Sequence, residues 1–128
     1  YYIMMGECYM YLNDYKEAAT YFGIVVKHKP KQIAGWESYI KCLIANDQLD
    51  SALEQTELAY MSTQGKVIFV YYRSAILFMM QKRKEGLLQL EMALSKSGKW
   101  LNKLIKFYPE LIQDAKVVEL ISQYKKLK

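Results

Sequence analysis

The sequence contains few of the residues that interrupt helices or that build covalent and metal-bound frameworks. Its 128 residues include two prolines, six glycines, two cysteines and one histidine. Cys8 and Cys42 are too few for a disulfide framework, and His28 alone cannot complete a zinc site or a Cys-His dyad. We therefore expect both cysteines to be buried as small apolar side chains, and we expect His28 to lie at a helix end.

Motifs that carry chemistry are also missing. There is no glycine-rich phosphate loop, no HExxH and no GxSxG, so the sequence predicts a non-enzymatic protein with no cofactor, metal or catalytic residue. The longest apolar stretch, VIFVYYRSAILFMM, is interrupted by Arg73 and Ser74 and is too short to span a bilayer. No secretion signal is recognisable, which favours the cytoplasm. The chain starts at Tyr1 in what reads as the middle of a helix, so we expect a fragment of a longer protein.

Charge is concentrated at the end of the chain. The net charge is +5, and all of this excess lies in residues 96–128, where eight lysines face three acidic residues. Lys96, Lys99, Lys103 and Lys106 recur at spacings of three and four and predict a basic strip on a helix. A solvated lysine face is the simpler interpretation of this strip, and binding to nucleic acid is the alternative.

The sequence repeats itself at a constant interval. Small side chains recur at positions 18, 52 and 86 (Ala18, Ala52, Gly86), and large ones recur at positions 9, 43 and 77. Apolar residues are spaced by three and four rather than by two. Both observations predict stacked pairs of antiparallel helices, which approach closely where Gly6 and Ala18 are small and where Phe22 fills the adjacent space.

These residues resemble the tetratricopeptide repeat. Residues Tyr2, Met5, Gly6, Tyr9, Ala18, Phe22 and Pro30 match the pattern of that repeat in register, and matches continue more weakly in the next two units. The resemblance implies an all-α fold, a right-handed α-solenoid of stacked antiparallel helix hairpins. It covers residues 1–98 as units 1–32, 33–66 and 67–98. The sequence of the final segment is also similar to the C-terminal end of some bacterial proteins of this family.

We expect helices at 1–12, 15–28, 33–45, 49–62, 66–80 and 84–96. Residues 99–128 read as C-terminal capping helices: a short helix from Trp100 that ends before Pro109, then an amphipathic helix. Asp114 is its expected N-cap, and Lys125, Lys126 and Lys128 are expected at its C-terminal end. Asn13 and Asp14 are expected to form the corner between the first two helices.

The resemblance also implies a function, the binding of a peptide or a partner helix in the concave groove of the solenoid. Its groove-facing positions correspond here to Glu7, Met10, Tyr11, Glu37, Lys41, Ile44, Tyr71, Tyr72 and Phe78. Two alternatives stay open: an anionic partner, such as nucleic acid, bound by the basic end, and a role as the scaffold arm of a larger enzyme. Self-association through an exposed edge of the first hairpin is a further expectation.

Overall fold

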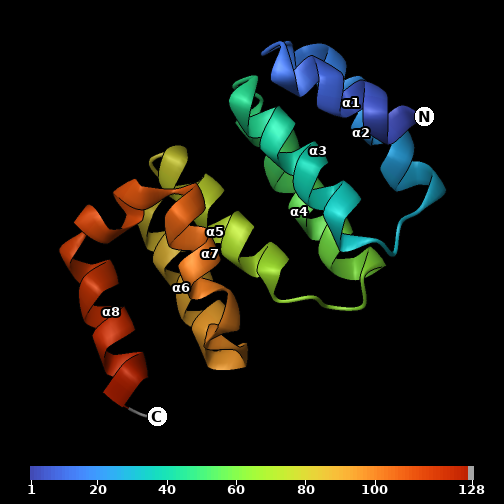
Figure 1. Cartoon of the computed structure of the whole chain (residues 1–128). Helices are drawn as coiled ribbons and strands as arrows, with labels where there is room; N and C mark the ends of the chain where they lie inside the picture. The colour runs from blue at the N-terminus through green and yellow to red at the C-terminus, as the bar shows by residue number, and fades with distance from the viewer. Residues whose placement is uncertain (127–128) are drawn as a thin grey trace. The chain divides into compact units, whose positions relative to one another are not determined.

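The computed structural model describes residues 1–126, and this part of the chain is all-helical, with no strand (Figure 1). The α-helices are α1 (Tyr2–Tyr11), α2 (Tyr15–His28), α3 (Ile33–Ala45), α4 (Leu49–Ser62), α5 (Ile68–Met79), α6 (Arg83–Lys96), α7 (Leu101–Phe107) and α8 (Ala115–Lys126). Two 3-10 helices, η1 (Gly98–Trp100) and η2 (Pro109–Gln113), flank α7. The predicted all-α class and the six predicted helices are confirmed to within two residues at their ends. Lys128, predicted at the end of the last helix, lies outside the described residues.

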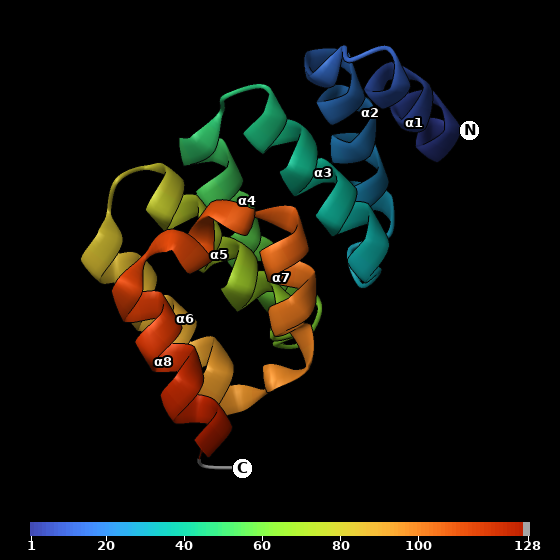
Figure 2. The ribbon, with the colours of Figure 1, turned by 60° about the vertical axis from the view of Figure 1, so that its left-hand side comes forward.

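The chain divides into two compact units. The first, Tyr1–Gly65, contains α1 to α4, in which each helix packs against the next along the chain. The second starts at Lys66 and contains α5 to α8, in which α5 packs against α6 and α7, and α6 packs against α8. Figure 2 shows α8 running alongside α6 within this second unit.

One turn geometry ends α4 at Gln64 and also ends α1, α3 and α5, where it recurs at a constant interval along the sequence. Asn13, Asp47 and Gln81 follow the ends of α1, α3 and α5, and all three have positive φ angles, of 60°, 59° and 64°. In each case the next residue donates its backbone N–H to the carbonyl five residues earlier, as in Asp14 to Tyr9 at 2.8 Å. This pattern is a Schellman motif, which closes a helix and reverses the chain. Asp14 then caps α2 by accepting the Glu17 N–H at 3.3 Å, as predicted for this corner.

The first hairpin packs as its small residues predict. Gly6 and Ala18 are buried, and a Cβ placed on Gly6 would lie 2.6–2.9 Å from three atoms of the Phe22 ring. The absent side chain of Gly6 therefore makes room for this ring, which is only 2% exposed. The expectation that these three residues meet between the first two helices is confirmed.

The C-terminal segment also follows its local signals. The chain leaves α7 at Phe107, and Pro109 starts η2, because the residue before a proline avoids helical geometry. Asp114 caps α8 by accepting the N–H groups of Lys116 and Val117 at 2.9 and 3.3 Å. The predicted N-cap is confirmed.

Candidate functional site

Within the first unit, α1 and α3 present the residues that the sequence assigned to a groove, and both helices pack on α2. Tyr11 is 89% exposed and Glu7 is exposed, whereas Met10, Glu37, Lys41 and Ile44 are half-buried. This set, which we call the unit 1 face, mixes apolar side chains with charges of both signs. All six members are therefore accessible in whole or in part.

The groove prediction for the second unit is wrong for two tyrosines. Tyr71 is 0% and Tyr72 is 1% exposed. The Tyr71 hydroxyl donates to the Ser97 carbonyl at 2.6 Å, and the Tyr72 ring packs edge-on against Phe107 with ring centroids 5.2 Å apart. The segment that follows α6 thus returns over the surface that we expected to be open.

Phe78, the third predicted groove residue of this unit, packs inside its own hairpin. The ring is half-buried, and a Cβ on Gly86 would lie 2.8 Å from it. Ser74 donates its hydroxyl to the Gly86 carbonyl at 2.9 Å in the same place. Phe78 therefore fills space between α5 and α6, and its exposed part is small.

The face of α1 that carries Tyr1, Met4 and Cys8 is open. Tyr1 is 84% and Met4 is 68% exposed, and Cys8 is exposed. The expectation that both cysteines are buried is wrong for Cys8 and confirmed for Cys42, which is 0% exposed. The reason is that α3 packs against both α2 and α4, whereas α1 packs against α2. We call the three residues the α1 edge.

A hollow of about 270 Å³ adjoins the start of α1. Tyr1, Tyr2, Ile3, Val25, His28 and Lys29 line it. The Tyr2 ring is stacked on His28 at 6.3 Å with an interplanar angle of 4°. His28 is the last residue of α2 and is exposed, as expected for a histidine at a helix end. The hollow makes the edge of the first hairpin uneven rather than flat, so a partner side chain has a place to enter.

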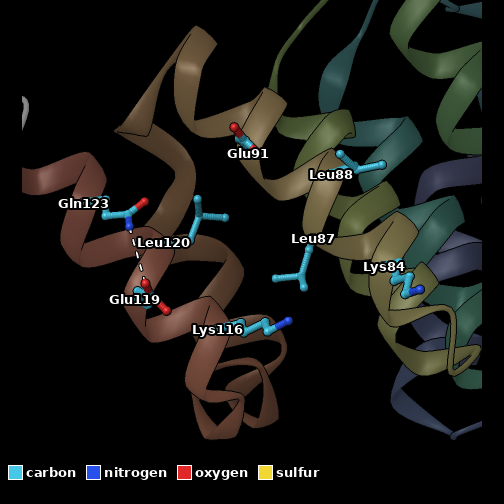
Figure 3. Close-up of a pocket in the computed structure, with 8 residues that line it drawn as sticks. All are labelled: Lys84, Leu87, Leu88, Glu91, Lys116, Glu119, Leu120 and Gln123. Atoms are coloured by element: carbon cyan, nitrogen blue, oxygen red, sulfur yellow. Dashed lines mark hydrogen bonds between the residues drawn. The ribbon is translucent and has the colours of Figure 1, made fainter.

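A groove between α6 and α8 was not predicted from the sequence. It encloses about 340 Å³ and is lined by Lys84, Leu87, Leu88, Glu91, Lys116, Glu119, Leu120 and Gln123 (Figure 3). Each helix contributes residues at spacings of three, four and seven, so each presents one face of a helix to the groove. The sequence did carry this signal, but it could not show that the two faces meet.

Apolar and charged side chains occupy different places in the groove. Leu87 and Leu120 are half-buried, and Leu88 is 61% exposed. Lys84 and Lys116 lie in the first turns of their helices, and Glu91 lies two turns further along α6. Figure 3 shows the Leu87 and Leu120 side chains directed into the space between the helices.

Close contacts at both ends of α8 fix it against neighbouring segments. At its start, the Arg83 guanidinium donates two hydrogen bonds to Asp114, through Nη2 at 2.9 Å and through Nε. At its end, Tyr124 packs so closely on Gly98 that a Cβ there would overlap the ring. These contacts therefore fix the position of α8 at both ends of the groove.

The prediction that the lysine strip lies on one helix is wrong, because Lys96 ends α6, Lys99 lies in η1, and Lys103 and Lys106 lie in α7. All four lysines are exposed. The ammonium groups of Lys99 and Lys103 lie 5.0 and 5.6 Å from the centroid of the Trp100 ring, within the range of cation–π attraction. The strip thus combines four cations with one half-buried aromatic ring.

Among residues 1–126, no group of three or more His, Cys, Asp or Glu side chains is arranged to hold a metal ion, and no helix has the length and apolarity needed to cross a membrane. The described part of the chain defines an all-helical protein in which the turn between paired helices recurs at a constant interval. A scan against protein-family models found no matching family, and a search of curated proteins found no match.

Proposed function

We propose that the chain is a non-enzymatic protein-interaction module of the tetratricopeptide type, a right-handed solenoid of stacked helix hairpins with capping helices at its C-terminal end. Three Schellman turns at equal intervals along the sequence support the repeat, together with the motif residues of the first unit. Repeats of this kind bind partners on surfaces formed by successive helices.

The unit 1 face is the proposed binding surface. The observation that carries this proposal is Tyr11, an aromatic side chain that is 89% exposed beside the half-buried Met10. A tyrosine supplies rigid contact area with a hydroxyl at its end, and a methionine adapts to different shapes. Glu7, together with Glu37 and Lys41, adds polar contacts at the rim. The ligand is a short peptide or partner helix with apolar side chains.

A peptide-display selection on the intact chain tests the proposal. Selected peptides are expected to lose about tenfold or more in affinity for Tyr11→Ala, since aromatic residues often dominate binding at interfaces. Met61→Ala is the control, because Met61 is 71% exposed on α4 and is not part of the unit 1 face. Equal affinity for Tyr11→Ala and the original chain would refute the assignment.

A second proposal concerns the α1 edge, which we infer pairs with the same edge of a second copy. The equivalent stripe of α3 is Gly35, Ser38 and Cys42, of which Gly35 and Cys42 are buried within the chain. No side chain of the α1 edge is charged, so two copies meet there without repulsion between charged side chains. Such a contact is symmetric and closed.

Light scattering as a function of concentration tests the pairing. We expect a dimer that Met4→Glu disrupts, because the substitution places a charge in the apolar contact. The matched control is Met61→Glu, since Met61 is about as exposed as Met4 but lies on α4. A monomer at every concentration would contradict the inference.

The basic strip supports the alternative, an anionic partner such as nucleic acid. Phosphate contacts made by Lys96, Lys99, Lys103 and Lys106 would give an affinity that falls steeply as salt rises. We expect no such binding, because the four lysines lie in three separate elements and two of them, Lys99 and Lys103, already contact the half-buried Trp100 ring. Steep salt-dependent binding of an oligonucleotide would favour the alternative instead.

The remaining alternative, the scaffold arm of a larger enzyme, is tested by the sequence of the full-length gene product.

A further inference from the structure

The groove between α6 and α8 combines an apolar centre with charges of opposite sign at separate places. Leu87, Leu88 and Leu120 supply the apolar surface. Lys84 and Lys116 both lie in the first turns of their helices, which the Arg83–Asp114 ion pair brings together. The Asp114 carboxylate already caps the start of α8, so the attraction for an anion comes from the two lysine ammonium groups.

Negative charge follows the lysines along both walls, at different distances. Glu91 lies two turns beyond Lys84 on α6, and Glu119 lies one turn beyond Lys116 on α8. The Gln123 amide nitrogen is 3.5 Å from the Glu119 carboxylate, so Glu119 faces along its helix toward the C-terminal end. Lysines at the start of both walls and Glu91 at the far end of the α6 wall thus give the groove a direction, whereas Glu119 lies beside Leu120 in its middle.

The spacing of the lining residues indicates the shape of what fits. On both walls they recur at i, i+3, i+4 and i+7, the period with which one helix packs into the surface of another. An amphipathic helix places its own apolar ridge at the same period. The volume of about 340 Å³ is large enough for a few side chains of such a ridge and too small for a folded domain.

We propose that the α6–α8 groove is a second binding site, and that its ligand is an amphipathic helix of a partner protein. The ligand carries two leucine-like side chains one turn apart, an acidic residue on one side of them and a basic residue on the other. The apolar pair contacts Leu87, Leu88 and Leu120. The acidic residue lies at Lys84 and Lys116, and the basic residue lies at Glu91.

This site is separate from the unit 1 face, and its occupation does not depend on the function proposed for that face. The groove belongs wholly to the second unit, because all of its lining residues lie between Lys84 and Gln123. Two contacts fix α8 in place before any ligand binds. They join Arg83 to Asp114 and Tyr124 to Gly98. Binding to preorganised walls avoids part of the entropy cost of ordering them.

The probe is a fluorescein-labelled alanine-based helical peptide of about 20 residues, a length at which an isolated helix is stable enough to test. It carries two leucines four positions apart, a glutamate one turn before them and a lysine one turn after them. Fluorescence anisotropy with the whole chain is expected to show saturable binding with a Kd of about 100 µM or tighter, an affinity typical of a small groove. No saturation up to about 1 mM would overturn the proposal.

Two substitutions on α6 distinguish peptide binding in the groove from binding elsewhere on that helix. Leu88→Glu is expected to weaken peptide binding at least about tenfold, because it places a charge in the apolar centre. Met92→Glu is the control, since Met92 is 46% exposed on α6 and does not line the groove. Both changes are at exposed positions, so the fold is retained. Equal affinities for the two variants would refute the site.

Charge reversal tests the direction of the groove. The double variant Lys84→Glu/Lys116→Glu is expected to bind the probe about tenfold more weakly, because two rim attractions become repulsions. A second peptide, with lysine in place of the glutamate, is expected to bind this variant more tightly than it binds the original chain. Loss of both peptides from the variant would contradict the charge assignment. Tyr11→Ala leaves the affinity of the probe unchanged, and a loss there would place the binding on the unit 1 face instead.

Discussion

Replacing Gly6 by alanine tests how the first hairpin is held together. The added Cβ would lie 2.6 Å from Phe22 Cε2, 2.8 Å from Cζ and 2.9 Å from Cδ2. The Phe22 ring is 2% exposed and has little room to move away. Overpacking of this kind costs about 1–3 kcal/mol. Alanine is also a better helix former than glycine by about 1 kcal/mol, which offsets part of that cost.

The same substitution at Gly23 supplies a matched control. Gly23 lies in α2, and a Cβ there would meet the Tyr39 ring at 3.5–3.6 Å, an ordinary van der Waals contact. Gly23→Ala therefore keeps the gain in helix propensity, about 1 kcal/mol, without the steric cost. The two variants are expected to differ in stability by about 1–3 kcal/mol, with Gly6→Ala the less stable.

Urea and thermal denaturation followed by far-UV circular dichroism measure this difference. It corresponds to about 3–6 °C in Tm per kcal/mol for a chain of this size. An unchanged m-value would show that the compared transitions expose the same surface. Adding Phe22→Leu to Gly6→Ala is expected to recover part of the loss, because the shorter side chain lacks the ring atoms that clash. If Gly6→Ala is as stable as Gly23→Ala, the reasoning is wrong.

Three further predictions concern the turns that end the helices, the Arg83–Asp114 ion pair at the start of α8, and the two cysteine thiols. Gln81 holds φ at 64°, so Gln81→Gly is expected to raise stability by about 1 kcal/mol in urea denaturation. Asn13→Gly is expected to change the stability less, because asparagine tolerates this geometry. Equal effects of the two substitutions would contradict this prediction. The hydrogen bonds from Arg83 hold the pKa of Asp114 below its ordinary value, so its stabilisation of α8 is present above about pH 4 and is lost as pH falls through the lowered pKa. Amide-exchange protection of α8 should therefore fall in acid, whereas Asp114→Asn should show low protection already at neutral pH; acid-insensitive protection in the original chain would refute this. Burial raises the pKa of Cys42 to about 11, so a maleimide at pH near neutral should label Cys8 alone, and labelling of Cys42 in the folded chain would contradict the structure.

Local patterns were sufficient to predict the helices. The gaps between the predicted helices contain each residue that the structure has in a left-handed conformation, including Gln81, whose residue type alone does not indicate a turn. The break at Pro109 and the cap at Asp114 also depend on neighbouring residues in the sequence. Such features are fixed by steric limits and hydrogen bonds within a few residues, so they can be read without knowing the rest of the fold.

Features that depend on distant segments could not be predicted in this way. The α6–α8 groove requires Arg83 and Asp114 to meet across 31 residues, and each helix alone reads only as amphipathic. The burial of Tyr71 and Tyr72 depends on the chain returning over α5 by way of Ser97 and Phe107. A signal for this burial was present, because α5 is apolar on every side except at Arg73 and Ser74.

The helices α1 and α5 each pack against the helix that follows them, yet they have different environments. Both are almost free of charge, but α1 has one buried residue, Gly6, and α5 has nine. The helix α5 is stabilised by burial, because neighbours that include α6 and α7 cover it. An apolar helix that lacks this cover keeps the same driving force for burial. The open faces of α1 therefore favour contact with another protein, which is why the proposed unit 1 face and the proposed α1 edge both include residues of α1.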